Sequence, residues 1–475
     1  MRTKLRRALY VVSVVVLVPL AAHVGVRRWA HLEPPELSLP PDGSPSGASL
    51  KQEKGRRAVR TLGSSYAVER GKLLEVGLRG SPETIGYRHA RLLYGRMVDN
   101  EGVLLRRFTE FVPSRLAQTA LLDLAQLRYR NVDRGMAPDR LREIAAGARG
   151  FQPDPYADFF PTFQRFVYLN ALYDMALSFE RSPLIGCTSF VSTGDASVDG
   201  SALLARNFDF EVDSIFDAGK AIFFVAEDGK LPFASVAWPG LVGVVSGMNL
   251  TGLAAVVHGA RAGEPGATGE PVVHALRRIL QTTTVVDGAV RALAEQEPMV
   301  SHIVVLVDAS GAARAVERVP GREQHVRVLA RRAAVTNHLV GPAAKDEKNV
   351  HVLETTSSRA RERRAAELVR GAAPATAATA VAWLRDRRAA GSRPLTLGDR
   401  DAIDALIATH GVVMDASTKT LWVSEGPHLL GRFVAFSLGE RFAADYDPAQ
   451  AAAPRTIPAD PLLKSAELAR YRDGR

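Results

Sequence analysis

The stretch Gly186-Cys187-Thr188-Ser189-Phe190 contains the only cysteine in the 475-residue chain. A single cysteine closes no disulfide within its chain and supplies no metal site built on several thiolates. Its thiol is therefore either inert packing or a nucleophile. Residues 187–191 have the composition of a β-strand, residues 192–200 are rich in turn formers, and residues 202–210 predict a returning strand. The cysteine is thus expected at the start of a β-hairpin.

The returning strand places two opposite charges, Arg206 and Asp209, inside an otherwise apolar run. Buried charges are costly unless they are paired, so these two side chains need a partner or a task. Two interpretations stay open on these residues alone. One is a buried thiol beside a structural ion pair, and the other is a nucleophile with charged groups around it.

Five sequence blocks, beginning on the returning strand, follow Cys187 in one order along the chain. They are Ala205-Arg206-Asn207-Phe208-Asp209-Phe210, Gly247-Met248-Asn249-Leu250-Thr251-Gly252-Leu253, Val335-Thr336-Asn337-His338, Ser358-Arg359-Ala360-Arg361 and Leu421-Trp422-Val423-Ser424-Glu425-Gly426-Pro427. With the cysteine they resemble the N-terminal-nucleophile (Ntn) hydrolase superfamily, especially its isopenicillin-N acyltransferase-like, choloylglycine hydrolase and penicillin V acylase-like members. The resemblance runs from residue 61 to the C-terminal region.

The resemblance implies an α+β fold, a four-layer αββα sandwich, and a chain that cuts itself between Gly186 and Cys187. The chemistry of these two residues suits such a cut. A free thiol has its pKa above neutrality and needs a base. The α-amino group released on Cys187 would have a pKa of about 7.7 to 8 and would lie on the same residue as the thiol. Gly186 has no side chain to obstruct attack on its own carbonyl.

The resemblance also assigns roles to polar residues. The implied catalytic residues are Cys187, Arg206, Asp209, Asn337 and Arg359. Asp209 would hold the amino group and Arg206 would favour the thiolate. The Asn337 amide would stabilise the oxyanion, together with a backbone NH at His258 or Gly259. The arginines between residues 359 and 364 also fit a solvated helix face, so both interpretations of Arg359 stay open.

The sequence therefore predicts an autoproteolytic, Cys-dependent amidohydrolase or acyltransferase. Its substrate would be a small-molecule or lipid-like N-acyl amide, attacked through an acyl-enzyme on Cys187. Two alternatives remain. One is a cysteine hydrolase with a separate histidine base and no self-cleavage, and the other is an inactive, membrane-tethered binding protein of the same fold. Against the second stands the joint presence of Cys187, Arg206, Asp209 and Asn337.

Composition divides the chain into five regions. They are a signal anchor or signal peptide at 1–30, a flexible tether at 31–60, a helical N-terminal region at 61–186, the catalytic domain at 187–445 and a peripheral tail at 446–475. Residues 8–26 are mostly apolar and follow four basic residues, which favours a membrane anchor with the catalytic domain outside the cytoplasm. Removal of this segment would instead give a secreted or periplasmic protein.

Charge and motif content exclude other function classes. The first 60 residues carry eleven Lys and Arg against four Asp and Glu, which is seven of the net ten positive charges. The body lacks the basic stripe with interleaved aromatics that binds nucleic acid. The only His-x-Glu, at His31-Leu32-Glu33, has no cysteine pair to complete a zinc site, so we expect neither a metal nor a cofactor. The sequence does not indicate an oligomeric state.

Overall fold

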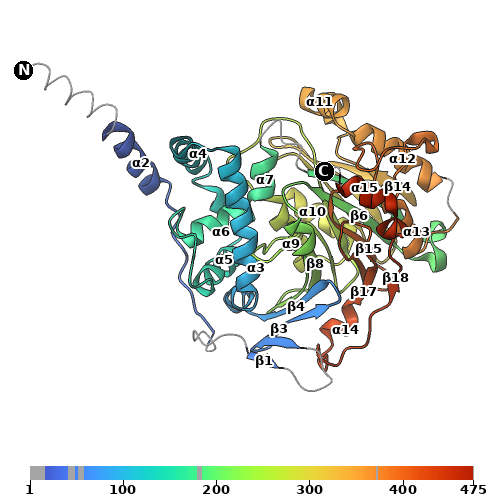
Figure 1. Cartoon of the computed structure of the whole chain (residues 1–475), viewed down its shortest axis with the longest axis horizontal. Helices are drawn as coiled ribbons and strands as arrows, with labels where there is room; N and C mark the ends of the chain where they lie inside the picture. The colour runs from blue at the N-terminus through green and yellow to red at the C-terminus, as the bar shows by residue number, and fades with distance from the viewer. Residues whose placement is uncertain (1–16, 41–48, 52–57, 179–184, 371–372, 474–475) are drawn as a thin grey trace, which may run out of the picture.

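Two β-sheets form the centre of the protein (Figure 1). The computed structural model describes residues 17–40, 49–51, 58–178, 185–370 and 373–473. In spatial order the larger sheet contains β1 Ser49–Lys51, β2 Val59–Leu62, β3 Ser65–Arg70, β4 Leu73–Gly80, β7 Ala221–Glu227, β8 Phe233–Ala237, β9 Ser246–Asn249, β10 Ala254–Gly259, β11 His302–Val307, β12 Ala313–Arg318 and β13 His325–Val328. The smaller sheet contains β14 Arg332–Val335, β5 Ile185–Ser192, β6 Leu203–Phe210, β15 Ala408–Asp415, β16 Thr420–Ser424, β17 Phe433–Ser437 and β18 Thr456–Ile457.

Helices surround the two sheets (Figure 1). They are α2 Val18–Trp29, α3 Pro82–Phe111, α4 Arg115–Arg128, α5 Pro138–Gly150, α6 Thr162–Asn170, α7 Leu172–Leu177, α8 Ile215–Ala218, α9 Val272–Thr282, α10 Val286–Ala294, α11 Glu347–Thr355, α12 Ser358–Arg370, α13 Ala377–Leu384, α14 Leu438–Phe442 and α15 Ala466–Asp473. Helices α9 and α10 pack on the larger sheet, whereas α12 and α13 pack on the smaller one.

The side chains of each strand alternate between its two faces, and this alternation explains how the sheets and helices form layers. On β7, Ile222 and Phe224 face the smaller sheet and join a buried cluster with Val412 of β15. Their neighbours Phe223 and Val225 face the opposite way, into the cluster formed with the helices. Because successive side chains of a strand point to opposite faces, one strand serves both interfaces. The layers are therefore helix, sheet, sheet and helix, and the predicted α+β class is confirmed.

The predicted cysteine hairpin is formed by β5 and β6 near the middle of the smaller sheet. In its antiparallel register Cys187 lies opposite Phe208, and Gly186 lies opposite Asp209. The turn between the strands falls within residues 193–202, close to the expected position. The register places the predicted nucleophile and the predicted carboxylate on neighbouring rows of the sheet.

The N-terminal region differs from the predicted all-helical composition. Residues 59–80 form β2, β3 and β4, and β4 pairs in parallel with β7 over seven residues. The helical pattern begins only at α3, where Ser81 caps the helix by accepting a hydrogen bond from the Thr84 amide. Two-residue loops that begin with glycine, Gly63-Ser64 and Gly71-Lys72, join these strands into hairpins, so a local signal was present that the prediction did not use. Only the pairing of β4 with β7, in which Leu74 lies opposite Ala221, has no local signal.

The predicted anchor and tether are only partly described. Helix α2 covers the second half of the apolar run, and residues 8–16 lie outside the described residues. No helix in the described part of the chain has both the length and the apolar character needed to cross a membrane. The predicted tether begins against the body, because Leu32 is buried in the main core and the Gln164 side chain donates to the Ala30 carbonyl.

The C-terminal tail also packs on the domain. Tyr446 donates a hydrogen bond to the buried Glu75 carboxylate, which also pairs with Arg70 at 2.8 Å. Further along the tail, Leu468 of α15 is buried. The start of the tail therefore packs on side chains of β2 and β3, whereas Leu468 joins a separate small cluster with Leu406 and Leu430.

A cut before Cys187 is expected to leave both fragments in one folded particle. The pairing of β4 with β7 and the burial of α3, α6 and α7 against the larger sheet do not require an intact bond at residue 186. The cut protein should elute as one species in native size-exclusion chromatography and separate only under denaturing conditions. Elution of a free N-terminal fragment would contradict this expectation.

Candidate active site

Cys187 is completely buried and contacts an arginine. The Arg206 Nη2 atom donates to the Cys187 Sγ at 3.1 Å and to the Val257 carbonyl at 2.8 Å. Burial raises the pKa of the Cys187 thiol, and the positive charge of Arg206 opposes this rise. The structure therefore brings together the predicted nucleophile and the predicted cation that favours its thiolate.

Arg206 is itself fully buried, with every contact made to the protein interior. Its Nη1 atom donates to the Ser246 hydroxyl at 2.5 Å and approaches the Val245 carbonyl at 3.3 Å. Its guanidinium lies 4.2 Å from the centre of the Phe208 ring. These contacts fix the guanidinium in one position, which is what a preorganised catalytic cation requires.

Asp209 lies beside the predicted cleavage site. A Cβ atom placed on Gly186 would lie 3.1 Å from the Asp209 Oδ2 atom, so only a residue without a side chain fits there comfortably. The Oδ1 atom is buried and finds no hydrogen-bond partner among the described residues. Burial raises the pKa of Asp209 to about 7, although Arg361 and Arg206 oppose the rise. The carboxyl group is therefore poised to accept a new donor.

Asn337 joins the nucleophile to the larger sheet. Its Oδ1 atom accepts a hydrogen bond from the Cys187 backbone nitrogen at 2.8 Å, and its Nδ2 atom donates to the Gly259 carbonyl at 3.1 Å. The side chain thus lies between two of the predicted site residues, close to the bond that joins Gly186 to Cys187. His258, the other predicted backbone donor, precedes Gly259 at the end of β10.

The structure places Arg361 in the site, and Arg359 outside it. Arg361 is buried and donates to the Cys187 carbonyl, to the Thr188 hydroxyl at 2.9 Å and to the Asn337 Oδ1 atom at 2.9 Å. Arg359, two residues earlier on α12, is exposed. Residues two apart on a helix point about 200° from one another, so only one of them can face the sheet. The second arginine of the same block was the residue that the sequence prediction missed.

The histidines close to the site are held neutral by their surroundings. His258 and His410 are buried, and burial together with the nearby Arg206 lowers the pKa of each well below its usual value. His258 Nε2 lies 2.7 Å from the Ser189 hydroxyl, and His410 Nε2 lies 3.0 Å from the Ser246 hydroxyl. Among the described residues, no group of three or more His, Cys, Asp and Glu side chains is arranged to hold a metal ion.

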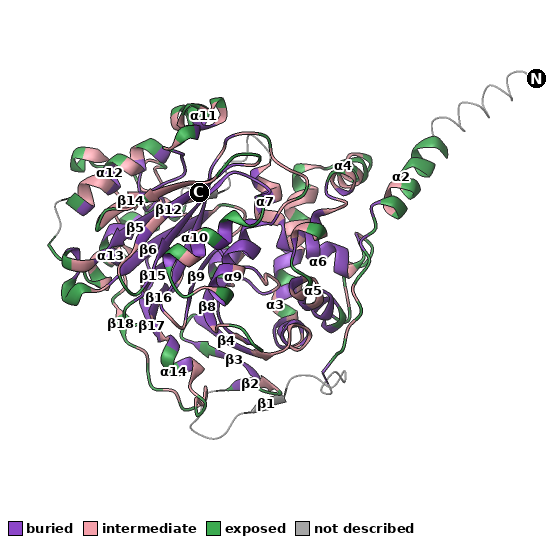
Figure 2. Ribbon diagram, turned by 180° about the vertical axis from the view of Figure 1, so that it is seen from behind, coloured by how far each residue is buried: buried purple, intermediate pink, exposed green. Residues whose placement is uncertain are grey.

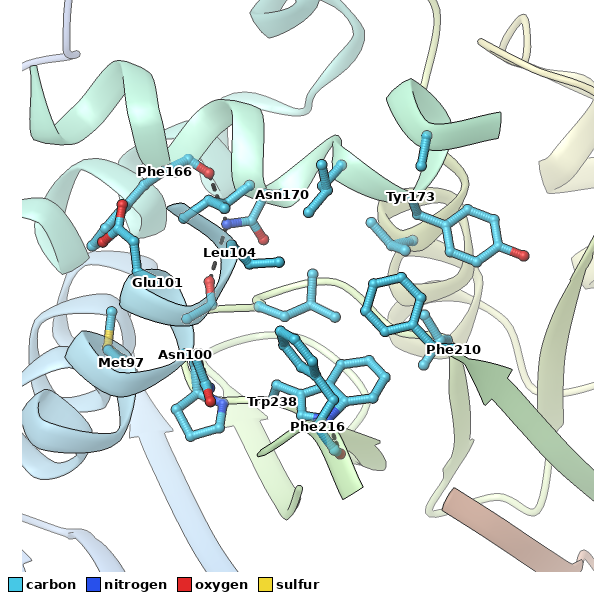
Figure 3. A pocket seen from close by; sticks show the side chains of 18 of the residues that line it. Met97, Asn100, Glu101, Leu104, Phe166, Asn170, Tyr173, Phe210, Phe216 and Trp238 are labelled. Atoms are coloured by element: carbon cyan, nitrogen blue, oxygen red, sulfur yellow. Dashed lines mark hydrogen bonds between the residues drawn. The ribbon is translucent and has the colours of Figure 1, made fainter. Parts of the chain in front are cut away.

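Two cavities adjoin the hairpin that carries the nucleophile, although Cys187 itself lines neither of them. The first is lined mainly by apolar side chains, with the rings of Phe210, Phe216 and Trp238 gathered on one side (Figure 3). Phe208, the cross-strand neighbour of Cys187, also lines it. The second cavity is more polar and is lined in part by Gly186, Asp209, Gly259, Asn337, Arg361 and Arg400. The neighbours of Cys187 on the hairpin therefore border an apolar space at Phe208 and a polar, charged one at Gly186 and Asp209.

Comparison with known proteins shows what the chain is similar to. Residues 197–423 match the model of a family described as acyl-coenzyme A:6-aminopenicillanic acid acyl-transferase. This match confirms the resemblance to the Ntn hydrolase superfamily that the order of the sequence blocks indicated. An uncharacterized protein of Archaeoglobus fulgidus is 30% identical over 229 residues, which is 42% of this chain and 36% of the relative. The chain thus spans about a third of the length of that relative.

Solved structures of amide hydrolases are similar to parts of the chain. A Caenorhabditis elegans ortholog of N-acylethanolamine-hydrolyzing acid amidase is 13% identical and covers 49% of this chain and 93% of its own, with a TM-score of 0.36. A mutant of the conjugated bile acid hydrolase from Clostridium perfringens is 12% identical and covers 58% and 97%, with a TM-score of 0.36. Penicillin V acylase from Agrobacterium tumefaciens is 19% identical and covers 58% and 99%, with a TM-score of 0.34.

Substitution of the two α12 arginines should separate their roles. Arg361→Met removes three buried hydrogen bonds, although the Asn337 Oδ1 atom keeps the one from the Cys187 nitrogen, so the free energy of unfolding should fall by about 1–3 kcal/mol. Arg359→Met, the matched control on the exposed face, should change the free energy by less than about 0.5 kcal/mol. Urea denaturation followed by circular dichroism measures both. Equal effects of the two substitutions would remove Arg361 from the site.

Proposed function

We propose that the protein is a self-cleaving Ntn amidohydrolase or acyltransferase whose nucleophile is Cys187. The proposal rests on the contacts that Cys187 and the preceding Gly186 make. The Cys187 thiol contacts Arg206, and its backbone nitrogen contacts Asn337. The preceding Gly186 lies against the Oδ2 atom of Asp209, whose other oxygen has no hydrogen-bond partner among the described residues. A structural thiol requires none of these contacts.

Self-cleavage would proceed as an acyl shift between Gly186 and Cys187. The Cys187 sulfur attacks the carbonyl carbon of Gly186, the bond to the Cys187 nitrogen breaks, and that nitrogen takes up the proton released by the thiol. Water then hydrolyses the resulting thioester, which leaves a carboxylate on Gly186 and restores the thiol. The product carries a free α-amino group on Cys187, adjacent to Asp209 and to the Asn337 oxygen. Both can accept hydrogen bonds from the new amine.

Turnover of an external amide repeats the same attack with the new amine as base. The amine takes the proton of the thiol, the sulfur attacks the substrate carbonyl, and the leaving nitrogen receives the proton as the acyl-enzyme forms. Water releases the acyl group as a carboxylic acid, whereas an amine acceptor gives a new amide. Arg206 favours the thiolate and the Asn337 amide supports the oxyanion.

The two cavities suggest how an N-acyl substrate lies across the nucleophile. The apolar cavity suits the acyl group, because aromatic and aliphatic side chains form most of its wall (Figure 3). The second cavity contains Asp209, Arg361 and Arg400 and suits the polar amine part. The substrate class that we propose is therefore an N-acyl amide with a bulky or long apolar acyl group.

The proposal includes a location. Basic residues precede the apolar run at residues 8–26, which supports a membrane-anchored protein with its catalytic domain outside the cytoplasm. If the segment is removed, the same chain would be secreted or periplasmic. Protease protection of the intact cells, followed by immunodetection of the catalytic domain, tests the orientation.

Substitution of the nucleophile tests the proposal directly. Cys187→Ala should abolish both chain cleavage and amide turnover, because no other group on the residue can form the acyl intermediate. Cys187→Ser should cleave slowly, since a hydroxyl performs the same shift as a poorer nucleophile. Denaturing gels with N-terminal sequencing detect a fragment that begins at residue 187, and release of amine from N-acyl amides of varied chain length reports turnover. A Cys187→Ala protein with normal turnover would exclude this function.

The pH dependence of self-cleavage should report Asp209. The pKa of this carboxyl is raised to about 7, so its charged form increases as the pH rises through 7. If the carboxylate is needed next to Gly186, the rate of cleavage of purified precursor should rise over the same range. Asp209→Asn preserves the shape without the titration, so it should cleave more slowly and flatten this limb of the profile. An unchanged profile in the variant would assign the limb to another group.

A further inference from the structure

Helices α2 and α4 lie near one another at one end of the molecule (Figures 1 and 2), and large apolar side chains are exposed on both helices and at the last residue of α3. The side chains of Phe111 and Leu116 are 85% and 84% exposed. We call this the α2/α4 apolar surface, and its members are Leu20, Val24, Phe111, Leu116, Leu121 and Leu124. Soluble proteins rarely leave so many large apolar side chains together in water, and such a group marks a site of interaction.

Specific contacts hold α2 against α4 and against the residues that follow α4. His23 Nδ1 lies 2.8 Å from an oxygen of Asp123, which belongs to α4. At the other end of α2 the Arg130 guanidinium lies 4.6 Å from the centre of the Trp29 ring. No residue of α2 is buried, although the helix is rich in Val, Leu and Ala. The helix therefore presents its apolar side chains outward from a defined position.

Helix α4 separates this surface from the interior. Leu116, Ala120 and Leu124 recur every four residues, so they share the exposed face of the helix. Leu122 and Ala125 of the same helix face inward and line an apolar cavity beneath it. The outer surface and this cavity are therefore two sides of one helix.

The cavity beneath α4 adjoins the apolar cavity beside Cys187. Leu104, Leu169 and Leu172 line both of them. These shared leucine side chains place the cavity beneath α4 directly next to the apolar cavity near the site.

The charges around the surface suit an anionic partner. Arg28 and Arg115 are exposed at its border, and the only acidic residue of α4, Asp123, is engaged by His23. The sequence before α2 adds four basic residues among the first seven and an apolar run that leads directly into the helix. Apolar side chains bordered by arginine are typical of segments that lie in the interface of anionic membranes.

We propose that the α2/α4 apolar surface docks on an anionic lipid bilayer and that an acyl chain leaving the bilayer enters beneath α4. The docking does not depend on the proposed function, whereas the route to Cys187 rests on it. The surface would lie in the headgroup region, with Leu116 and Leu124 in contact with the acyl chains. A substrate partitioned into the bilayer would then reach the catalytic cavity without crossing water.

A fluorescent label at the surface tests the docking. The full chain carrying Cys187→Ala has no native thiol, so a cysteine introduced by Leu124→Cys can be labelled alone with the polarity-sensitive dye NBD. Val328→Cys is the matched control, because Val328 is 74% exposed on β13, at the far edge of the larger sheet. Each labelled protein is mixed with vesicles of phosphatidylglycerol or of phosphatidylcholine.

The label at position 124 should shift to shorter wavelength and brighten several-fold with phosphatidylglycerol vesicles, and respond less to phosphatidylcholine. The label at 328 should not respond, and Leu116→Glu should abolish the response at 124. A chain that sediments with vesicles while the label at 124 remains in water would overturn the proposal. A shift that appears without vesicles and grows with protein concentration would overturn it too, because a second copy would then cover the surface. Catalysis plays no part in this readout, so its outcome is independent of the proposed function.

Discussion

The buried contact between Arg206 and the Cys187 thiol is the interaction on which the site depends. Burying a charged side chain costs several kcal/mol of stability unless hydrogen bonds and opposite charges compensate for the lost water. Arg206 belongs to β6 of the smaller sheet, yet its acceptors Val245, Ser246 and Val257 belong to the larger sheet or to the loop before it. The arginine therefore joins the two sheets at the nucleophile, and displacement of either sheet would separate the cation from the thiol.

The same charge determines which base can serve the thiol. Because Arg206 lies beside His410 and close to His258, it disfavours a second positive charge, and both imidazoles stay neutral. A neutral buried imidazole whose pKa is far below 7 is a poor acceptor for a thiol proton. An α-amino group released on Cys187 would lie beside the Asp209 carboxyl. The negative charge of this carboxylate would offset the unfavourable effect of Arg206 on a protonated amine. This balance of charges favours the N-terminal nucleophile over a separate histidine base.

The sequence contained enough information for the hairpin, the fold class and most of the polar cluster, because these depend on local patterns. Cys187 and Arg206 share one face of the hairpin, because Cys187 lies opposite Phe208, and Asp209 lies opposite Gly186 on the other face, so the register alone places both charges next to the predicted cleavage site. Arg361 could not be separated from Arg359, since the arginine run on α12 has no clear apolar face to indicate which residue points inward. The strands at 59–80 were missed for a different reason. Their two-residue turns, Gly63-Ser64 and Gly71-Lys72, indicate hairpins and were overlooked, whereas the pairing of β4 with β7 is long-range and leaves no local signal.

Asn337 shows how one side chain can serve both the uncut and the cut chain. Its oxygen already accepts from the nitrogen of Cys187, and a free amine at the same atom would still donate to it. The amide nitrogen carries two hydrogens, and the Gly259 carbonyl uses one of them. The other remains for an oxyanion, so the contact that positions the side chain survives when the donor acts. Self-cleavage would therefore leave the support of the site in place and change only the group at Cys187 from an amide to an amine.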